Sequence, residues 1–110
     1  MSNYILQNKV PVKCEDIREW GNWMSKNNRC VIRTDRGTMC VSTVFLGADY
    51  NFGDDHPLFF ESMVFADYPE MTESDCNRYS TWEEARIGHI EMCKKWFGEY
   101  TEEDLFLDTL

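Results

Sequence analysis

Residues 38–65 read TMCVSTVFLGADYNFGDDHPLFFESMVF, and this stretch decides the fold. It contains two runs of apolar, β-branched and aromatic residues, 39–46 and 58–65, which are typical of β-strands. The segment between them is rich in Gly, Asp, Asn and Pro, and it is too long for a two-residue hairpin turn. We therefore expect two neighbouring antiparallel strands joined by a long loop, with the rest of the chain covering or extending this pair.

Both strands of this pair are apolar on both faces. Successive side chains of a strand point to opposite faces of its sheet. In the first run Cys40, Val44 and Leu46 alternate with Val41 and Phe45, and in the second Leu58, Phe60 and Val64 alternate with Phe59, Met63 and Phe65. Such strands are covered on each side, and a chain of this size has few helices to do so. The pattern therefore predicts a homo-oligomer in which a second copy covers one face.

A helix is expected before the sheet, over residues 15–26. Ile17, Trp20 and Met24 recur there at helical spacing, and acidic residues precede them at the positive end of the helix dipole. Trp23 lies off this stripe, either on a flank of the core or on a contact surface. We favour the flank of the core.

Residues 29–65 are expected to form a β-meander. The segment 29–34, RCVIRT, alternates like a strand, and Gly37 supplies a turn into the next strand. At the N-terminus, residues 3–12 predict an edge strand or an extended arm, because Pro11 cannot donate a hydrogen bond to a sheet.

The clearest helix is expected over residues 81–97. Thr81 and Glu84 have the spacing of a capping box, and Gly98 ends the segment. Its apolar stripe consists of Trp82, Ala85, His89, Met92, Cys93 and Trp96, whereas Ile87 and Ile90 lie on a different face.

The two segments on either side of this helix are polar. Residues 66–77 predict an acidic loop, and residues 78–80 add a short strand or simply lead into the helix. Residues 99–110 predict an acidic tail or a short capped helix.

These elements predict one α+β domain over residues 1–110. We expect a small antiparallel sheet of three to four strands, with an N-terminal helix and a C-terminal helix packed on it. A chain of 110 residues is long enough for a single core, and its 43% hydrophobic and 15% aromatic content argues against disorder.

Charge and cysteine usage exclude several classes of protein. The net charge of −9 disfavours binding to a nucleic-acid backbone. It permits docking on a basic partner or imitation of a nucleic acid, although most small acidic proteins are merely soluble. No apolar run approaches the roughly 20 residues of a membrane span, and the N-terminus lacks the pattern of a signal peptide. The five cysteines are widely spaced without a C-x-x-C pair, which predicts free thiols in a reducing cytosol.

Two polar residues, His89 and Glu61, occupy positions where apolar residues are expected. His89 lies at the centre of its helical stripe, and Glu61 lies inside an apolar strand, where a carboxylate must be paired. If the helix packs on that face, the two could meet, with Thr43 within reach. Such a pair is either a general acid–base set or a hydrogen bond that orients the helix on the sheet. We favour the second, because no nucleophile or metal motif accompanies the pair.

The central loop also carries potential ligand residues. Asp49, Asp54, Asp55 and His56 are ligand types for hard cations, but their spacing matches neither an EF-hand nor an H-E-x-x-H motif, so we predict no metal and no cofactor. Candidates for contact with a ligand or a partner are Asp49, Tyr50, Phe52, His56, Trp23, Arg78 and Tyr79. The fold could also gather some of Arg33, Arg36, Arg78 and Arg86 into a pocket for an anionic ligand.

The strings VSTVFLGADYNFGDDHPLFFESMVF and RYSTWEEARIGH resemble a family of small, mostly uncharacterised phage and prophage proteins. Members typically read STVFLGLDH-x-F, a Pro-containing turn, LFETMVFGG and then RY-x-T-x-EEA-x-x-GH. The resemblance covers about residues 4–96. This chain has Tyr50 where His is usual, Ser62 in place of Thr, and Ala66-Asp67 in place of a Gly pair.

The resemblance implies a phage origin and expression in the host cytoplasm, where small accessory phage proteins often act against host defences. The first expectation is a non-enzymatic counter-defence protein that blocks a host defence protein or sequesters a signalling nucleotide. The alternatives are a small hydrolase of such a nucleotide, with His89 and Glu61 as acid and base, and a phage structural or regulatory interaction module. A nucleotide-sequestering protein needs an aromatic pocket with arginine, and a protein blocker needs an exposed patch.

Overall fold

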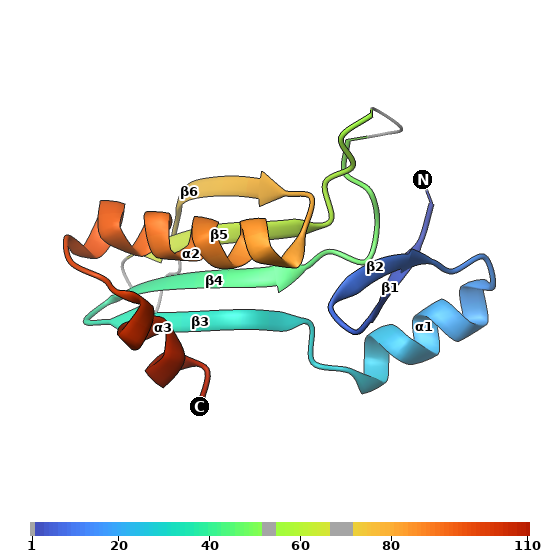
Figure 1. Ribbon diagram of the computed structural model, residues 1–110, viewed down its shortest axis with the longest axis horizontal. Coiled ribbons are helices and arrows are strands. Elements are labelled where there is room, and N and C mark those ends of the chain that lie inside the picture. The colour runs from blue at the N-terminus through green and yellow to red at the C-terminus, as the bar shows by residue number, and fades with distance from the viewer. Residues whose placement is uncertain (1, 52–54, 67–71) are drawn as a thin grey trace.

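The structure of the protein, a computed structural model, describes residues 2–51, 55–66 and 72–110, and it confirms the α+β class (Figure 1). In chain order the elements are β1 (Tyr4–Gln7), β2 (Val10–Lys13), α1 (Ile17–Lys26), β3 (Cys30–Arg36), β4 (Met39–Phe45), β5 (Phe60–Ala66), β6 (Thr72–Tyr79), α2 (Trp82–Phe97) and α3 (Glu102–Asp108).

The main sheet is an antiparallel meander with the order β3-β4-β5-β6 within the described residues. Gly37 has a positive φ of 60° in the turn between β3 and β4, as the sequence predicts. The expectation of a loop over residues 66–77 is wrong for its second half, because β6 begins at Thr72 and pairs with β5. As an edge strand, β6 has one strand neighbour and tolerates polar side chains.

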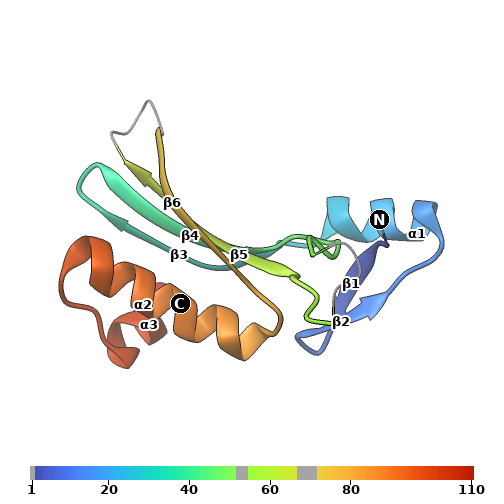
Figure 2. The same ribbon diagram turned by 90° about the horizontal axis from the view of Figure 1, so that it is seen from above.

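α2 and α3 lie on one face of this sheet, and α1 lies beyond its end (Figure 2). α2 crosses that face and contacts all four strands, and α3 packs beside it against β3. We call this the inner face and the opposite side the outer face. In the part of the chain that the structure describes, no helix covers the outer face.

The core lies between the inner face and the helices. Phe45, Phe60, Tyr79 and Ala85 form one buried cluster together with Phe59, and Ile32, Val41, Val64, Ile90, Met92, Cys93, Tyr100 and Leu105 form the other. The predicted stripe of α2 is therefore largely confirmed. Ile90, which the sequence places on a separate face, is buried in the core, whereas Ile87 is 47% exposed.

The ends of α2 follow their sequence signals closely. Thr81 is the N-cap and accepts a hydrogen bond from the backbone of Glu84, and Gly98 ends the helix with a φ of 90°. The Glu84 carboxylate accepts from the Thr81 hydroxyl at 3.1 Å rather than from the Thr81 backbone. In the C-terminal segment, a full capping box at Thr101 starts α3, so the tail ends in a helix.

The N-terminal arm is a hairpin rather than a single edge strand. β1 and β2 pair with Gln7 opposite Val10, which leaves Asn8 and Lys9 as a two-residue loop. Both loop residues have positive φ, 51° and 67°, as in a type I′ turn. Pro11 fits within β2 because this sheet has only two strands, so each of them is an edge.

The helix α1 fastens this hairpin to the end of the main sheet. Asp16 caps it by accepting from two backbone N–H groups in its first turn. The Trp20 indole N–H donates to the carbonyls of Tyr4 and Gly47, and the Trp23 ring packs edge-on against Phe45. Trp23 thus lies on a flank of the core, as favoured from the sequence.

Candidate functional site

His89 is fully buried where α2 meets the centre of the main sheet. Its Nδ1 atom lies 2.7 Å from the hydroxyl of Thr43 on β4, and its Nε2 atom lies 2.9 Å from the hydroxyl of Thr34 on β3. Thr43 in turn lies 2.6 Å from the hydroxyl of Ser62 on β5. The predicted contact between His89 and Thr43 is therefore present, and it belongs to a larger network.

The direction of each hydrogen bond in this network follows from counting protons. Thr34 donates to Asp108 Oδ2 at 2.7 Å, and a hydroxyl has only one proton to give. His89 Nε2 must therefore donate to Thr34, which leaves Nδ1 free to accept from Thr43. Thr43 then accepts from Ser62. The imidazole is neutral, and both of its nitrogens are occupied.

The C-terminal helix completes the network. Tyr100 donates to the same Asp108 oxygen at 2.5 Å, and the Arg36 guanidinium lies 3.8 Å from it. Burial alone would raise the pKa of Asp108, but the hydrogen bonds from Tyr100 and Thr34 and the charge of Arg36 hold it below its ordinary value. Burial lowers the pKa of His89 to about 4, an effect that Asp108 only partly opposes.

His89 and Glu61 do not meet, so they form neither the favoured orienting hydrogen bond nor the alternative acid–base pair. Ser62 lies opposite Thr43 in the β4–β5 register, and both face α2. Glu61 precedes Ser62 and therefore points to the outer face, where it pairs with Arg78 of β6 at 2.9 Å. A general base needs access to its substrate. His89 has no such access, because its side chain is buried and both ring nitrogens already have hydrogen-bond partners.

The outer face presents an apolar centre with charged edges. Its central side chains are Cys40, Ser42 and Val44 of β4 with Glu61, Met63 and Phe65 of β5, flanked by Arg33 and Asp35 of β3 and by Cys76 and Arg78 of β6. Val44, Met63 and Phe65 are partly exposed even though they are apolar. Each arginine has its own carboxylate here, Arg33 with Asp35 and Arg78 with Glu61.

Two hollows extend this surface at its ends. One, of about 350 Å³, lies between the end of α1 and β4, where Met24, Cys30 and Val44 line it. The other, of about 280 Å³, lies at the β3–β4 turn and is lined by Arg33 and Cys40, among others. An apolar strand surface with paired charges and shallow hollows is suited to contact with another protein.

The candidate binding residues named from the sequence do not form one site. Tyr50 and Arg78 come together, since the guanidinium lies 5.2 Å from the ring centre. Asp49 instead holds the loop by accepting from the backbone N–H groups of Asn51 and Leu58. Tyr79 is buried on the inner face, and His56 lies exposed in the loop. Phe52 and Asp54 lie outside the described residues.

The four arginines, some of which the fold could have gathered into an anionic-ligand pocket, are dispersed. Arg33 and Arg78 lie on opposite edges of the outer face, and Arg36 lies near Asp108. Arg86 donates to both Glu83 and Glu102. Every one of them is therefore engaged by carboxylates of this chain.

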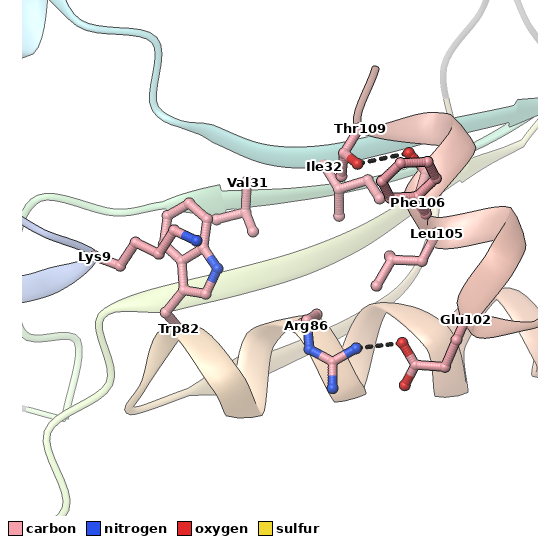
Figure 3. Close-up of a pocket in the computed structure, with 9 residues that line it drawn as sticks. All are labelled: Lys9, Val31, Ile32, Trp82, Arg86, Glu102, Leu105, Phe106 and Thr109. Carbon is pink, nitrogen blue, oxygen red and sulfur yellow. Dashed lines mark hydrogen bonds and ion pairs between the residues drawn. The ribbon is translucent and has the colours of Figure 1, made fainter.

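A pocket that the sequence did not predict lies between the tip of the N-terminal hairpin, β3, α2 and α3 (Figure 3). Its volume is about 410 Å³. Its lining consists of Lys9, Val31, Ile32, Trp82, Arg86, Glu102, Leu105, Phe106 and Thr109. The residues come from four separated segments, so no local motif could reveal it.

The five cysteines are free thiols, as expected. Across the parts of the chain that the structure describes, no three His, Cys, Asp or Glu side chains lie close enough to hold a metal ion together. Among the same residues, no helix combines the length and apolar character needed to span a membrane. Comparisons of the chain with known protein families, with curated proteins and with solved structures find no match.

Proposed function

We propose that this chain is a non-enzymatic binding protein that blocks a partner protein through the outer face of its sheet. The observation that carries the proposal is the uncovered outer face itself. Val44, Met63 and Phe65 leave apolar surface in water at the centre of a sheet whose other face is fully packed. Covering that surface with a partner removes it from water, which is favourable.

The charge of the chain indicates the chemistry of the partner. The net charge is −9, whereas the charges of the outer face are paired with one another. A basic protein with an exposed apolar patch would be steered by the long-range field and then held by the apolar centre. Two copies of this chain would repel each other instead, so a different protein is the better occupant.

The nucleotide-based alternatives have less support. The hydrolase alternative relied on His89 with Glu61, and these residues lie on opposite faces of the sheet. Sequestration of a nucleotide requires cations that are free to meet phosphates. Arg33, Arg78 and Arg86 are each held by carboxylates of this chain.

The resemblance to phage proteins supports the biological setting of the proposal. In that setting the partner is a host defence protein, and the chain acts in the host cytoplasm as a counter-defence protein. A structural or regulatory phage module would use the same face on a phage protein. The two are separated by whether the chain changes the outcome of infection in cells that carry a defence system.

Nucleotide retention tests the proposal against its alternatives. The purified chain is incubated with cyclic di- and trinucleotides and ADP-ribose derivatives, separated from free ligand, heated, and its supernatant is chromatographed. We expect no retained nucleotide and no altered nucleotide. Recovery of an intact nucleotide would show that the chain sequesters nucleotides and would contradict the proposed blocking of a protein. Recovery of an altered nucleotide would show that the chain is an enzyme.

A further inference from the structure

We propose that the pocket beside Trp82 is a second binding site and that it takes a small aromatic carboxylate or a similar flat organic anion. The site is separate from the outer face, because it opens between the N-terminal hairpin, β3, α2 and α3 on the other side of the sheet. The proposal therefore does not depend on the proposed function.

The walls of the pocket are suited to a flat apolar body. Trp82 forms one end, and the aliphatic side chains of Val31, Ile32 and Leu105 line the interior (Figure 3). Phe106 borders the opposite end with 64% of its surface exposed. A volume of about 410 Å³ lies within the range of small-molecule sites. Aromatic side chains at both ends favour a ring that can pack against them.

The charged groups at the rim indicate an anion. Arg86 gives three of its five N–H donors to Glu83 and Glu102, so two carboxylates offset its charge. Lys9 is different. Its ammonium lies 5.3 Å from the centre of the Trp82 ring, and within the described residues no carboxylate lies at ion-pair distance from it. Hydrogen bonds from Arg86 chiefly lower the pKa of Glu83, and the charge of Lys9 contributes to that shift from beyond ion-pair distance. Lys9 is thus the cation of the lining that makes no ion pair of its own and can meet a ligand.

The backbone at Lys9 is a second, independent observation. Lys9 is the second residue of a type I′ turn, with a φ of 67°, where glycine is strongly preferred. A lysine at this position costs stability that a glycine would not, and such strain is typical of functional positions. The turn places the Lys9 side chain over Trp82 at the pocket rim (Figure 3).

Matched probes test the proposal on the intact chain. Binding of 2-naphthoate and of its uncharged isostere 2-naphthamide is measured by titration calorimetry and by chemical-shift changes of the tryptophan indole N–H groups. We expect 2-naphthoate to bind at one saturable site, more tightly than 2-naphthamide, with the largest shift at the Trp82 indole. An exposed ion pair contributes up to roughly fivefold in affinity, so Lys9→Gln should weaken 2-naphthoate by up to about that factor and leave 2-naphthamide unchanged.

Two further variants serve as controls. Lys13→Gln removes the same charge from the neighbouring strand, outside the pocket, and should leave both affinities unchanged. Lys9→Gly should raise stability by relaxing the turn and still weaken 2-naphthoate, which separates binding from folding. The proposal would be overturned by equal affinity for the two probes or by the absence of saturable binding. It would also be overturned by equal effects of Lys9→Gln and Lys13→Gln, or by chemical-shift changes centred on another tryptophan.

Discussion

His89 is fully buried between α2 and the sheet, yet both of its ring nitrogens have hydroxyl partners. Through Thr34 and Thr43 it joins β3, β4 and α2, and through Asp108 the same network holds α3. A buried polar group with all its hydrogen bonds made specifies one relative position of the elements around it. This accounts for a histidine at the centre of an otherwise apolar stripe.

The free energy of unfolding should depend on pH through His89. Because burial lowers its folded-state pKa from 6.5 to about 4, the unfolded chain takes up a proton first as the pH falls. His89 makes its full contribution to the free energy of unfolding above about pH 6.5. About 3 kcal/mol of that contribution should be lost as the pH falls from 6.5 to 4. The pKa of Asp108 is lowered from 3.8, so its own contribution is lost only in stronger acid.

The His89→Gln variant isolates this effect. At pH 7 it should be less stable than wild type by roughly 1–3 kcal/mol, because a buried hydrogen-bonded group is replaced imperfectly. Its unfolding free energy, measured by urea denaturation at each pH, should approach that of wild type as the pH falls toward 4. Parallel curves for the two proteins would show that His89 does not titrate as described.

At the residue scale, the sequence predicts part of this network. The position of His89 on its stripe follows from periodicity, whereas Thr43 is expected near it only together with Glu61. The sequence pattern points to Glu61 as the partner instead of Ser62, because both faces of β5 are apolar and the pattern cannot tell which one meets the helix. Thr34 and Asp108 come from distant segments and carry no local signal.

At the scale of elements, two helical glycines have opposite environments. A Cβ atom added at Gly88 would lie 2.2 Å from ring atoms of Tyr79, whereas one added at Gly21 would meet nothing within 4 Å. Gly88 therefore allows α2 to approach β6 closely, and Gly21 has no packing role that would exclude alanine.

The two alanine variants should thus change stability in opposite directions. Gly88→Ala forces Tyr79 or the helix to move and should lower the free energy of unfolding by about 1–3 kcal/mol or more. Gly21→Ala should raise it by up to about 1 kcal/mol through helix propensity. Denaturant titrations measure both. A Gly88→Ala protein as stable as wild type would contradict the close packing of α2 on Tyr79.

Sequence patterns miss the elements that are stabilised by contacts with distant parts of the chain and carry no local signal of their own. β6 is polar and pairs with β5 along one edge only, so it has no alternating apolar signal. The turn of the N-terminal hairpin is Asn8-Lys9, whereas the usual type I′ turn is Asn-Gly. Because this pair is not a typical turn signal, the sequence does not predict the hairpin. In contrast, the sequence places α2 within one residue because its cap, stripe and terminal glycine agree.

At the scale of the whole molecule, the homo-oligomer expected from the sequence stays a prediction. The outer face offers the surface for it, but the net charge of −9 on each copy opposes it. Salt screens that repulsion. If copies associate through the outer face, light scattering should give a mass that rises above 13.1 kDa as the salt concentration is raised. A mass that falls with added salt would show that ion pairs hold the assembly instead.

The claim that the outer face blocks a host defence protein is tested most directly by counting plaques. The chain is expressed in bacteria carrying one defence system at a time, and a phage sensitive to that system is plated. Met63→Glu places a charge at the apolar centre of the outer face, and Ile87→Glu places one on the exposed side of α2. A buried unpaired charge weakens an interface by about 2–5 kcal/mol, which is at least roughly thirtyfold in affinity.

We predict that the wild-type chain restores plaque formation against at least one defence system, that Met63→Glu does not, and that Ile87→Glu does. Thermal melts monitored by circular dichroism establish that both variants are folded. A folded Met63→Glu protein that restores plaques as well as wild type, or loss of restoration in both variants alike, would contradict the account.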